Sequence, residues 1–320
     1  DAENGKLCVV FLFFFFQAED GIRDLVRSRG LGDVYKRQIL VRSHPADAWN
    51  VFLARRHSRS SFMAEAYVFP GGQIADADRD EKLQNCISMP AGFDPRALLQ
   101  DDTLSPETAQ SLFVCAIRET FEETGILLAR TRDGSPPNLT SEERNARFTA
   151  YRRELNAGRT TLGEMARLEN LVFPLDALAP YAHWITPEFL PKRFSTRFFL
   201  AALPEDQSAA TDQGELTDSL WAKPEEFLRR YRGREIVLMP PTLKTLEELA
   251  RYACLNDLFA GTRGRAIYPI LPEPGENMIK LPHDPEYGIE RYKQPARPEE
   301  PSRILMPDGL WRPGFDHEGT

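Results

Sequence analysis

The sequence predicts an α/β protein, in which short strands alternate with helices. Short β-rich runs alternate with segments of helical spacing along most of the chain. One of these segments, residues 105–125, carries a complete set of helix start and stop signals. The composition is that of an ordinary globular protein, with 42% hydrophobic and 28% charged residues. We therefore expect one α/β domain that carries two insertions.

The first expected strands lie at residues 39–42 and 49–54, which form a hairpin-like pair around a Pro-containing turn. A third strand at 67–69 ends at Pro70-Gly71-Gly72. Residues 79–104 show no clear period and contain several Pro and Gly residues, so an inserted loop is expected there.

A helix is expected to begin after Ser105, because Ser is a favoured N-cap residue and Pro106 suits the first helical position. It should end at Gly125, since glycine readily adopts the left-handed conformation of a helix C-cap. Residues 126–129 read as a strand. Residues 130–170 are polar with charged helical spacing and form the second expected insertion.

The rest of the chain predicts strands at 181–185, 193–203 and 219–222, and helices at 224–233 and 242–259. From residue 263 to 320 Pro recurs every few residues, so we expect an extended tail that packs on the surface or is partly disordered. The main domain is thus expected at 39–262.

Residues 1–38 are expected to lie outside the fold. An apolar run at 7–16 is too short to span a bilayer and lacks the flanks of a signal peptide. Residues 17–38 resemble translated sequencing-adapter read-through, and a disordered natural leader is the alternative. In either case we expect no function for this segment.

The formal net charge of −8 argues against a nucleic-acid partner, because such partners require a basic surface. The four cysteines are far apart, so neither a disulfide framework nor a zinc site is predicted. His57 and His183 are expected to be surface or hydrogen-bonded residues, since a hard cation prefers oxygen ligands. These features favour a small-molecule substrate and a reducing, cytoplasmic setting without a membrane partner.

The informative motif is FVCAIRETFEETGILL at residues 113–128. On a helix, Glu119, Glu122 and Glu123 crowd one side, and a divalent cation would relieve their repulsion. Arg118 lies four residues before Glu122 and can pair with it. A solvated acidic face is the simpler reading of a Glu-rich helix.

The order of residues favours a cation site over a solvated acidic face, because RETFEETGI at 118–126 resembles the second half of the Nudix box. Phe69-Pro70-Gly71-Gly72 resembles the start of the same box. This sequence departs from the family pattern by having Asp78 in place of Glu, and residues 79–117 replace a short spacer. An interrupted box resembles the peroxisomal-type coenzyme A diphosphatase branch of the Nudix hydrolases.

That resemblance implies a Nudix α/β/α sandwich, in which helices cover both faces of a mixed sheet, and a metal-dependent pyrophosphohydrolase. Glu119, Glu122 and Glu123 would hold Mg²⁺ or Mn²⁺, with Glu122 or Glu119 as the base and Arg118 orienting the cluster. Gly71 and Gly72 would let the backbone turn tightly beneath the site. Outside the box, Glu215 is the candidate for a further acid, and Arg193 and Arg197 are candidates for substrate phosphate.

The resemblance further implies that coenzyme A or acyl-CoA is cleaved to 3',5'-ADP and (acyl-)phosphopantetheine. The alternatives are ADP-ribose or another nucleoside diphosphate derivative and, in another class, a non-catalytic ligand sensor. The C-terminal residues contain no SKL-type address, which also fits the cytoplasmic expectation.

Overall fold

The computed structural model describes residues 33–44, 48–58, 64–187, 193–209 and 216–315. Its main sheet has the strand order β10-β7-β8-β1-β2-β3, with β9 also paired to β2. The strands are β1 (Asp33–His44), β2 (Ala48–Arg56), β3 (Tyr67–Val68), β7 (Ala179–Ile185), β8 (Phe194–Ala202), β9 (Leu216–Ala222) and β10 (Pro269–Ile270). The sheet is mixed, because β1 is antiparallel to β2 and parallel to β8.

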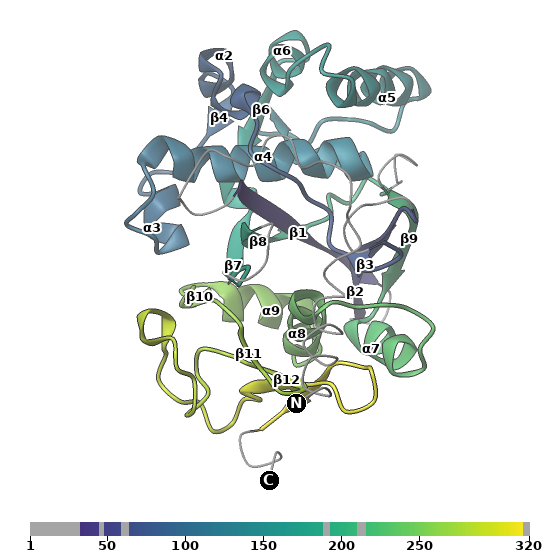
Figure 1. The fold of residues 1–320 in the computed structure, drawn as a ribbon. Coiled ribbons are helices and arrows are strands. Elements are labelled where there is room, and N and C mark those ends of the chain that lie inside the picture. The colour runs from purple at the N-terminus through teal and green to yellow at the C-terminus, as the bar shows by residue number, and fades with distance from the viewer. Residues whose placement is uncertain (1–32, 45–47, 59–63, 188–192, 210–215, 316–320) are drawn as a thin grey trace, which may run out of the picture.

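Helices cover both faces of this sheet, as predicted. Helix α4 (Pro106–Thr124) lies on one face, and α7 (Pro224–Arg232), α8 (Pro240–Leu249) and α9 (Leu255–Thr262) lie on the other (Figure 1). Alternation along the strands explains the two cores. In β1, Leu40 packs on the α4 side, whereas Ile39 and Val41 pack on the α8 side.

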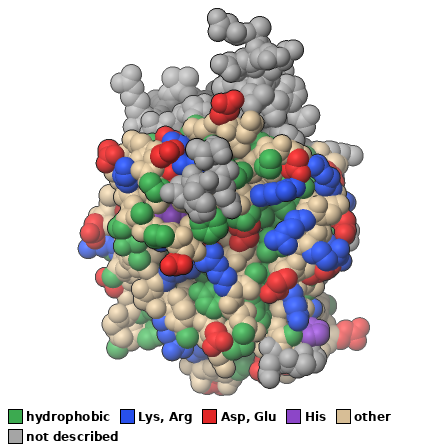
Figure 2. Space-filling view, turned by 90° about the horizontal axis from the view of Figure 1, so that it is seen from below, with side chains coloured by type: hydrophobic (Ala, Val, Ile, Leu, Met, Phe, Trp, Pro, Cys, Tyr) green, Lys and Arg blue, Asp and Glu red, His purple; other side chains and the backbone are tan. Residues whose placement is uncertain are grey.

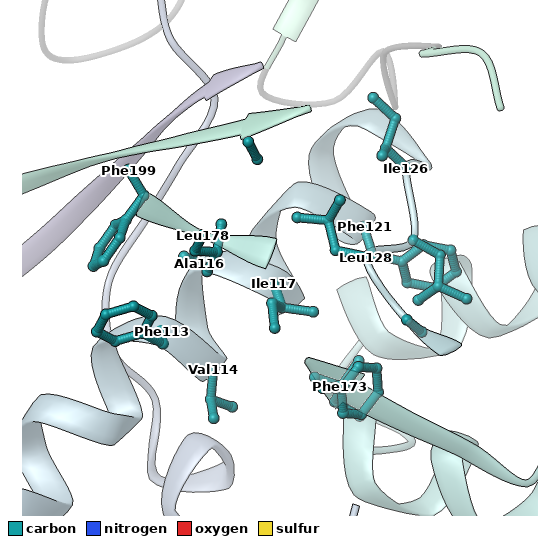
Figure 3. Packing of buried hydrophobic residues seen from close by; sticks show 14 of the residues in the cluster. Phe113, Val114, Ala116, Ile117, Phe121, Ile126, Leu128, Phe173, Leu178 and Phe199 are labelled. Atoms are coloured by element: carbon teal, nitrogen blue, oxygen red, sulfur yellow. The ribbon is translucent and has the colours of Figure 1, made fainter. Parts of the chain in front are cut away.

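The limits predicted for α4 are confirmed. The Ser105 hydroxyl accepts the N–H of Thr108 at 3.1 Å, and Gly125 has a φ of 75° and donates to the carbonyl of Phe121 at 2.9 Å. Phe113 and Phe121 belong to the apolar core around this helix (Figure 3). These contacts fix α4 along its length and hold its polar residues in place.

The expected strand at 126–129 is not formed, although its residues are buried. The side chain of Gln207 supplies both backbone partners that a neighbouring strand would have supplied. Its amide accepts the N–H of Leu127 at 2.7 Å and donates to the Leu127 carbonyl at 2.9 Å.

The two insertions fold together into a layer outside α4. The first, expected as a loop, contains α2 (Glu81–Gln84), β4 (Ile87–Ser88) and α3 (Pro95–Leu99). The second contains α5 (Glu142–Asn156) and α6 (Leu162–Leu168), followed by β6 (Leu171–Pro174). Strand β4 pairs with β6, and β6 with β5 (Arg130–Thr131). Contacts between distant segments, rather than local periodicity, therefore order the first insertion.

The C-terminal extension is also folded, contrary to the expected extended tail. It forms an antiparallel sheet of β11 (Glu273–Gly275), β12 (Met278–Lys280), β13 (Arg303–Leu305) and β14 (Arg312–Gly314). Ile279, Ile304 and Trp311 join the core beneath α7 and α8, and the Trp311 N–H donates to the Tyr231 hydroxyl at 2.7 Å. Seen from below, apolar side chains are interspersed with charges of both signs across this face (Figure 2).

The N-terminal boundary also differs from the prediction. Strand β1 begins at Asp33 rather than Ile39 and pairs with β8 from that residue onward. Lys36 and Gln38 are fully buried within it. The apolar run at 7–16 lies outside the described residues, and among those described no helix is long and apolar enough to cross a membrane.

Candidate active site

Arg118 is the hub of the polar side of α4. Its guanidinium holds Asp78 with two hydrogen bonds, Nε to Oδ1 at 2.7 Å and Nη2 to Oδ2 at 2.9 Å. Its Nη1 lies 2.6 Å from Glu122 Oε2 and 3.0 Å from Glu119 Oε1. The predicted ion pair between Arg118 and Glu122 is therefore present, and Arg118 brings two of the three candidate carboxylates together.

Asp78, the residue that departs from the family pattern, anchors this hub. Its carboxyl group is 1% exposed and also accepts the backbone N–H of Ala75 at 2.8 Å. A short acidic side chain suffices here because Asp78 lies in a one-turn helix, η1 (Asp76–Arg79), which packs directly on α4. The long insertion that follows leaves this contact intact.

The two box glycines lie against the carboxylates. Gly71 has a φ of 145°, and a Cβ on it would lie 2.1 Å from the carbonyl oxygen of Lys36. Its N–H donates to Glu123 Oε2 at 2.6 Å. A Cβ on Gly72 would lie 2.5 Å from Glu119 Oε1. A Cβ on Gly71 would overlap the backbone, whereas a Cβ on Gly72 would displace the Glu119 carboxylate. Both glycines therefore suit a loop that turns beneath the site.

Burial and crowding shape the charge of the cluster. Burial, together with the neighbouring charge of Glu119, raises the pKa of Glu122 to about 7, although Arg118 opposes the rise. Glu119 is also within 3.1 Å of the ammonium group of Lys36. This role of Lys36 was not predicted from the sequence, because residues 1–38 are expected to lie outside the fold. The available signal was that the β-rich pattern continues upstream of Ile39.

The candidate metal ligands do not all converge. Glu119 and Glu122 meet at Arg118, whereas Glu123 is turned to the Gly71 N–H. Accordingly, no group of three His, Cys, Asp or Glu side chains in the described ranges is already arranged around one point. Carboxylate oxygens suit a hard divalent cation, which needs only one or two of them when substrate phosphates complete its shell. Glu119 and Glu122 fit that requirement.

Arg197 is less available to a substrate than the sequence predicted. It is 3% exposed in β8 and forms an ion pair with Asp101 of the first insertion. Arg193 lies just before β8 and is half-buried. Glu215 is outside the described residues; the adjacent strand β9 starts opposite Arg56.

The two histidines do not belong to the carboxylate cluster. His183 Nε2 lies 2.8 Å from the Ser195 hydroxyl, and burial together with the charge of Arg197 lowers the pKa of His183 to about 3. It is therefore neutral and hydrogen-bonded, as predicted. His57 is near the surface, beside Ser58.

Comparison with known proteins places this geometry in context. Residues 36–251 match the family described as the NUDT19 Nudix domain. Proteins named acyl-coenzyme A diphosphatase NUDT19 are similar to the chain: that of Gallus gallus is 30% identical over 289 residues (77% of this chain, 76% of the relative). That of Homo sapiens is 30% identical over 282 residues (78% and 75%).

A solved structure agrees with the fold. The crystal structure of a NUDIX hydrolase from Alicyclobacillus acidocaldarius has a TM-score of 0.61 and 23% sequence identity. It aligns over 76% of this chain and 100% of that one. This similarity supports the α/β/α architecture around the carboxylate cluster.

Proposed function

Because the chain belongs to the NUDT19 Nudix family and is therefore a Nudix hydrolase of diphosphate bonds, we propose that its substrate is coenzyme A or acyl-CoA. Cleavage gives 3',5'-ADP and (acyl-)phosphopantetheine. The observation that carries the proposal is the interrupted box itself. Its two halves, separated by a folded insertion, still bring Arg118, Glu119 and Glu122 together with Gly71 and Gly72.

Nudix enzymes typically depend on a divalent metal, and we propose Mg²⁺ or Mn²⁺ held by Glu119 and Glu122. The metal, when bound, neutralises diphosphate oxygens and lowers the pKa of a bound water. Glu122 or Glu119 is the candidate for the base. Before the metal binds, burial raises the pKa of Glu122 to about 7, and a bound cation would lower that pKa and keep the carboxylate ionised. Arg118 fixes the Glu122 carboxylate from one side, and Glu123 fixes the loop at Gly71.

The remaining site residues have different support. We propose Arg193, which is half-buried just before β8, as the contact for substrate phosphate, because a guanidinium group can bind phosphate through forked hydrogen bonds. Arg197 is almost fully buried and forms an ion pair with Asp101. Glu215 stays a proposed further acid. We also propose a cytoplasmic protein that acts on a small molecule, with neither nucleic acid nor a membrane as partner.

A hydrolysis panel tests the substrate directly. The purified chain is incubated with coenzyme A, an acyl-CoA, ADP-ribose and a dinucleotide, each with Mg²⁺, Mn²⁺ or EDTA, and the products are identified by mass. We expect 3',5'-ADP from the first two substrates and none with EDTA. Brisk cleavage of ADP-ribose without cleavage of either CoA compound would refute the proposed substrate.

A further inference from the structure

The first insertion builds a groove along the early part of α4. The groove has a volume of about 610 Å³, within the range of small-molecule sites. Residues of η1, α2, α3 and the segment before α3 form one wall, and the first two turns of α4 form the other. Without the insertion, only the α4 wall would exist.

The groove lies on the same side of α4 as the active-site hub. Ser111 lines the groove and precedes Arg118 by about two helical turns and Glu122 by about three, so the three residues face the same direction. At 1.5 Å per residue, the groove lies about 10 to 18 Å along the helix from Arg118. Arg79 lines the groove, and the residue before it, Asp78, binds Arg118.

The lining of the groove combines apolar side chains with amide groups. Met89, Phe93 and two prolines supply the apolar part, and Met89 is 44% exposed. Gln84 and Gln110 hydrogen-bond to each other at 2.5 Å between their amide groups.

The charged groups on the lining offset each other. Arg79 and Arg96 have no carboxylate partner among the described residues. They are matched in number by Asp94 and Glu107 on the same lining. A site for a phosphate group would carry a surplus of positive charge, whereas an uncharged chain with amide groups needs none.

From these observations we infer that the groove binds the uncharged arm of the substrate, its pantetheine chain and attached acyl group. This inference rests on the proposed function. The arm is the part of an acyl-CoA that extends away from the diphosphate, and it combines amides with apolar groups. When the diphosphate lies at Glu119 and Glu122, the groove offers both kinds of partner beyond Arg79.

The test is Met89→Glu, which places a charge in the apolar part of the groove. Leu168→Glu is the matched control, because Leu168 is an exposed hydrophobic residue (66%) in the second insertion, away from the groove. For an acyl-CoA we expect Met89→Glu to raise KM by about 10-fold, the effect of losing one buried side chain. We expect no change for ADP-ribose, which has no such arm, and no effect of Leu168→Glu on either substrate.

A binding measurement separates failure of the inference from failure of the proposed function. S-acyl-pantetheine is titrated into the full chain without metal, and Met89→Glu should weaken its binding about 10-fold. That result supports the groove even if acyl-CoA is not hydrolysed. Hydrolysis of acyl-CoA with equal KM in Met89→Glu and wild type would overturn the inference while leaving the function intact. Equal losses for acyl-CoA and ADP-ribose would also overturn it, since they would mean that the groove serves the shared nucleotide end.

Discussion

Replacing Glu122 with Gln should stabilise the protein at alkaline pH while removing its activity. In the folded chain the pKa of Glu122 is about 7, chiefly because of burial, against an ordinary value of 4.5. An acid whose pKa is raised by folding holds its proton more tightly in the folded state. Stability therefore falls as pH rises from about 4.5 to 7, and the full cost remains above pH 7.

Above pH 7 the difference between these pKa values lowers the free energy of unfolding by about 3 kcal/mol. At pH 5 the loss is less than about 1 kcal/mol. Glutamine has nearly the same shape and no charge, so Glu122→Gln removes this cost. Arg118 keeps its two bonds to Asp78 and its contact with Glu119. Without metal, we expect a gain of about 1 to 3 kcal/mol in the free energy of unfolding at pH 8 and little gain at pH 5. Hydrolysis should fall on the order of 10³-fold.

Urea unfolding at the two pH values and turnover of the hydrolysed substrate are the measurements. Glu247→Gln is a matched control, because burial also raises the pKa of Glu247 to about 7, and this residue lies in α8 outside the site. It should show the same pH-dependent gain with unchanged turnover. If Glu122→Gln gave no gain at pH 8, or an equal gain at both pH values, the reasoning from burial would be refuted. Near-normal turnover of the variant would show that Glu122 is not the base.

Three further predictions concern strand β1 and the loop at Gly71. Gln38→Leu should raise the free energy of unfolding, measured by urea titration, by about 1 to 2 kcal/mol. Gln38 is fully buried, and its amide has no hydrogen-bond partner in the described structure. A lower free energy of unfolding in the variant would contradict this prediction. Gly71→Ala should lower the free energy of unfolding by about 3 kcal/mol or more, because the new Cβ would overlap the Lys36 carbonyl oxygen. A melting temperature equal to that of the wild type would refute this prediction. A chain starting at Asp33 should have the melting temperature and turnover of the full chain. A chain starting at Ile39 should have a lower melting temperature, because it loses the first part of β1. Equal melting temperatures of the two shortened chains would show that this strand segment is dispensable.

Local signals in the sequence were enough to predict the central helix and the ion pair on it. Ser105, Pro106 and Gly125 act through their own backbone neighbours, so the limits of α4 could be predicted without knowing the fold. The spacing of Arg118 and Glu122 is likewise a property of one helix, and their ion pair is present.

Tertiary structure alone decided the features that join distant segments. Leu127 finds its backbone partners in the side chain of Gln207, so a strand-like sequence forms no strand. Arg197 receives Asp101 from an insertion almost a hundred residues away, which turns a candidate phosphate ligand into a buried ion pair. The Pro-rich tail folds because Ile279 and Trp311 find an apolar surface beneath α7 and α8. A sequence pattern reports what a residue prefers locally, but burial and pairing across the fold decide whether that preference is satisfied.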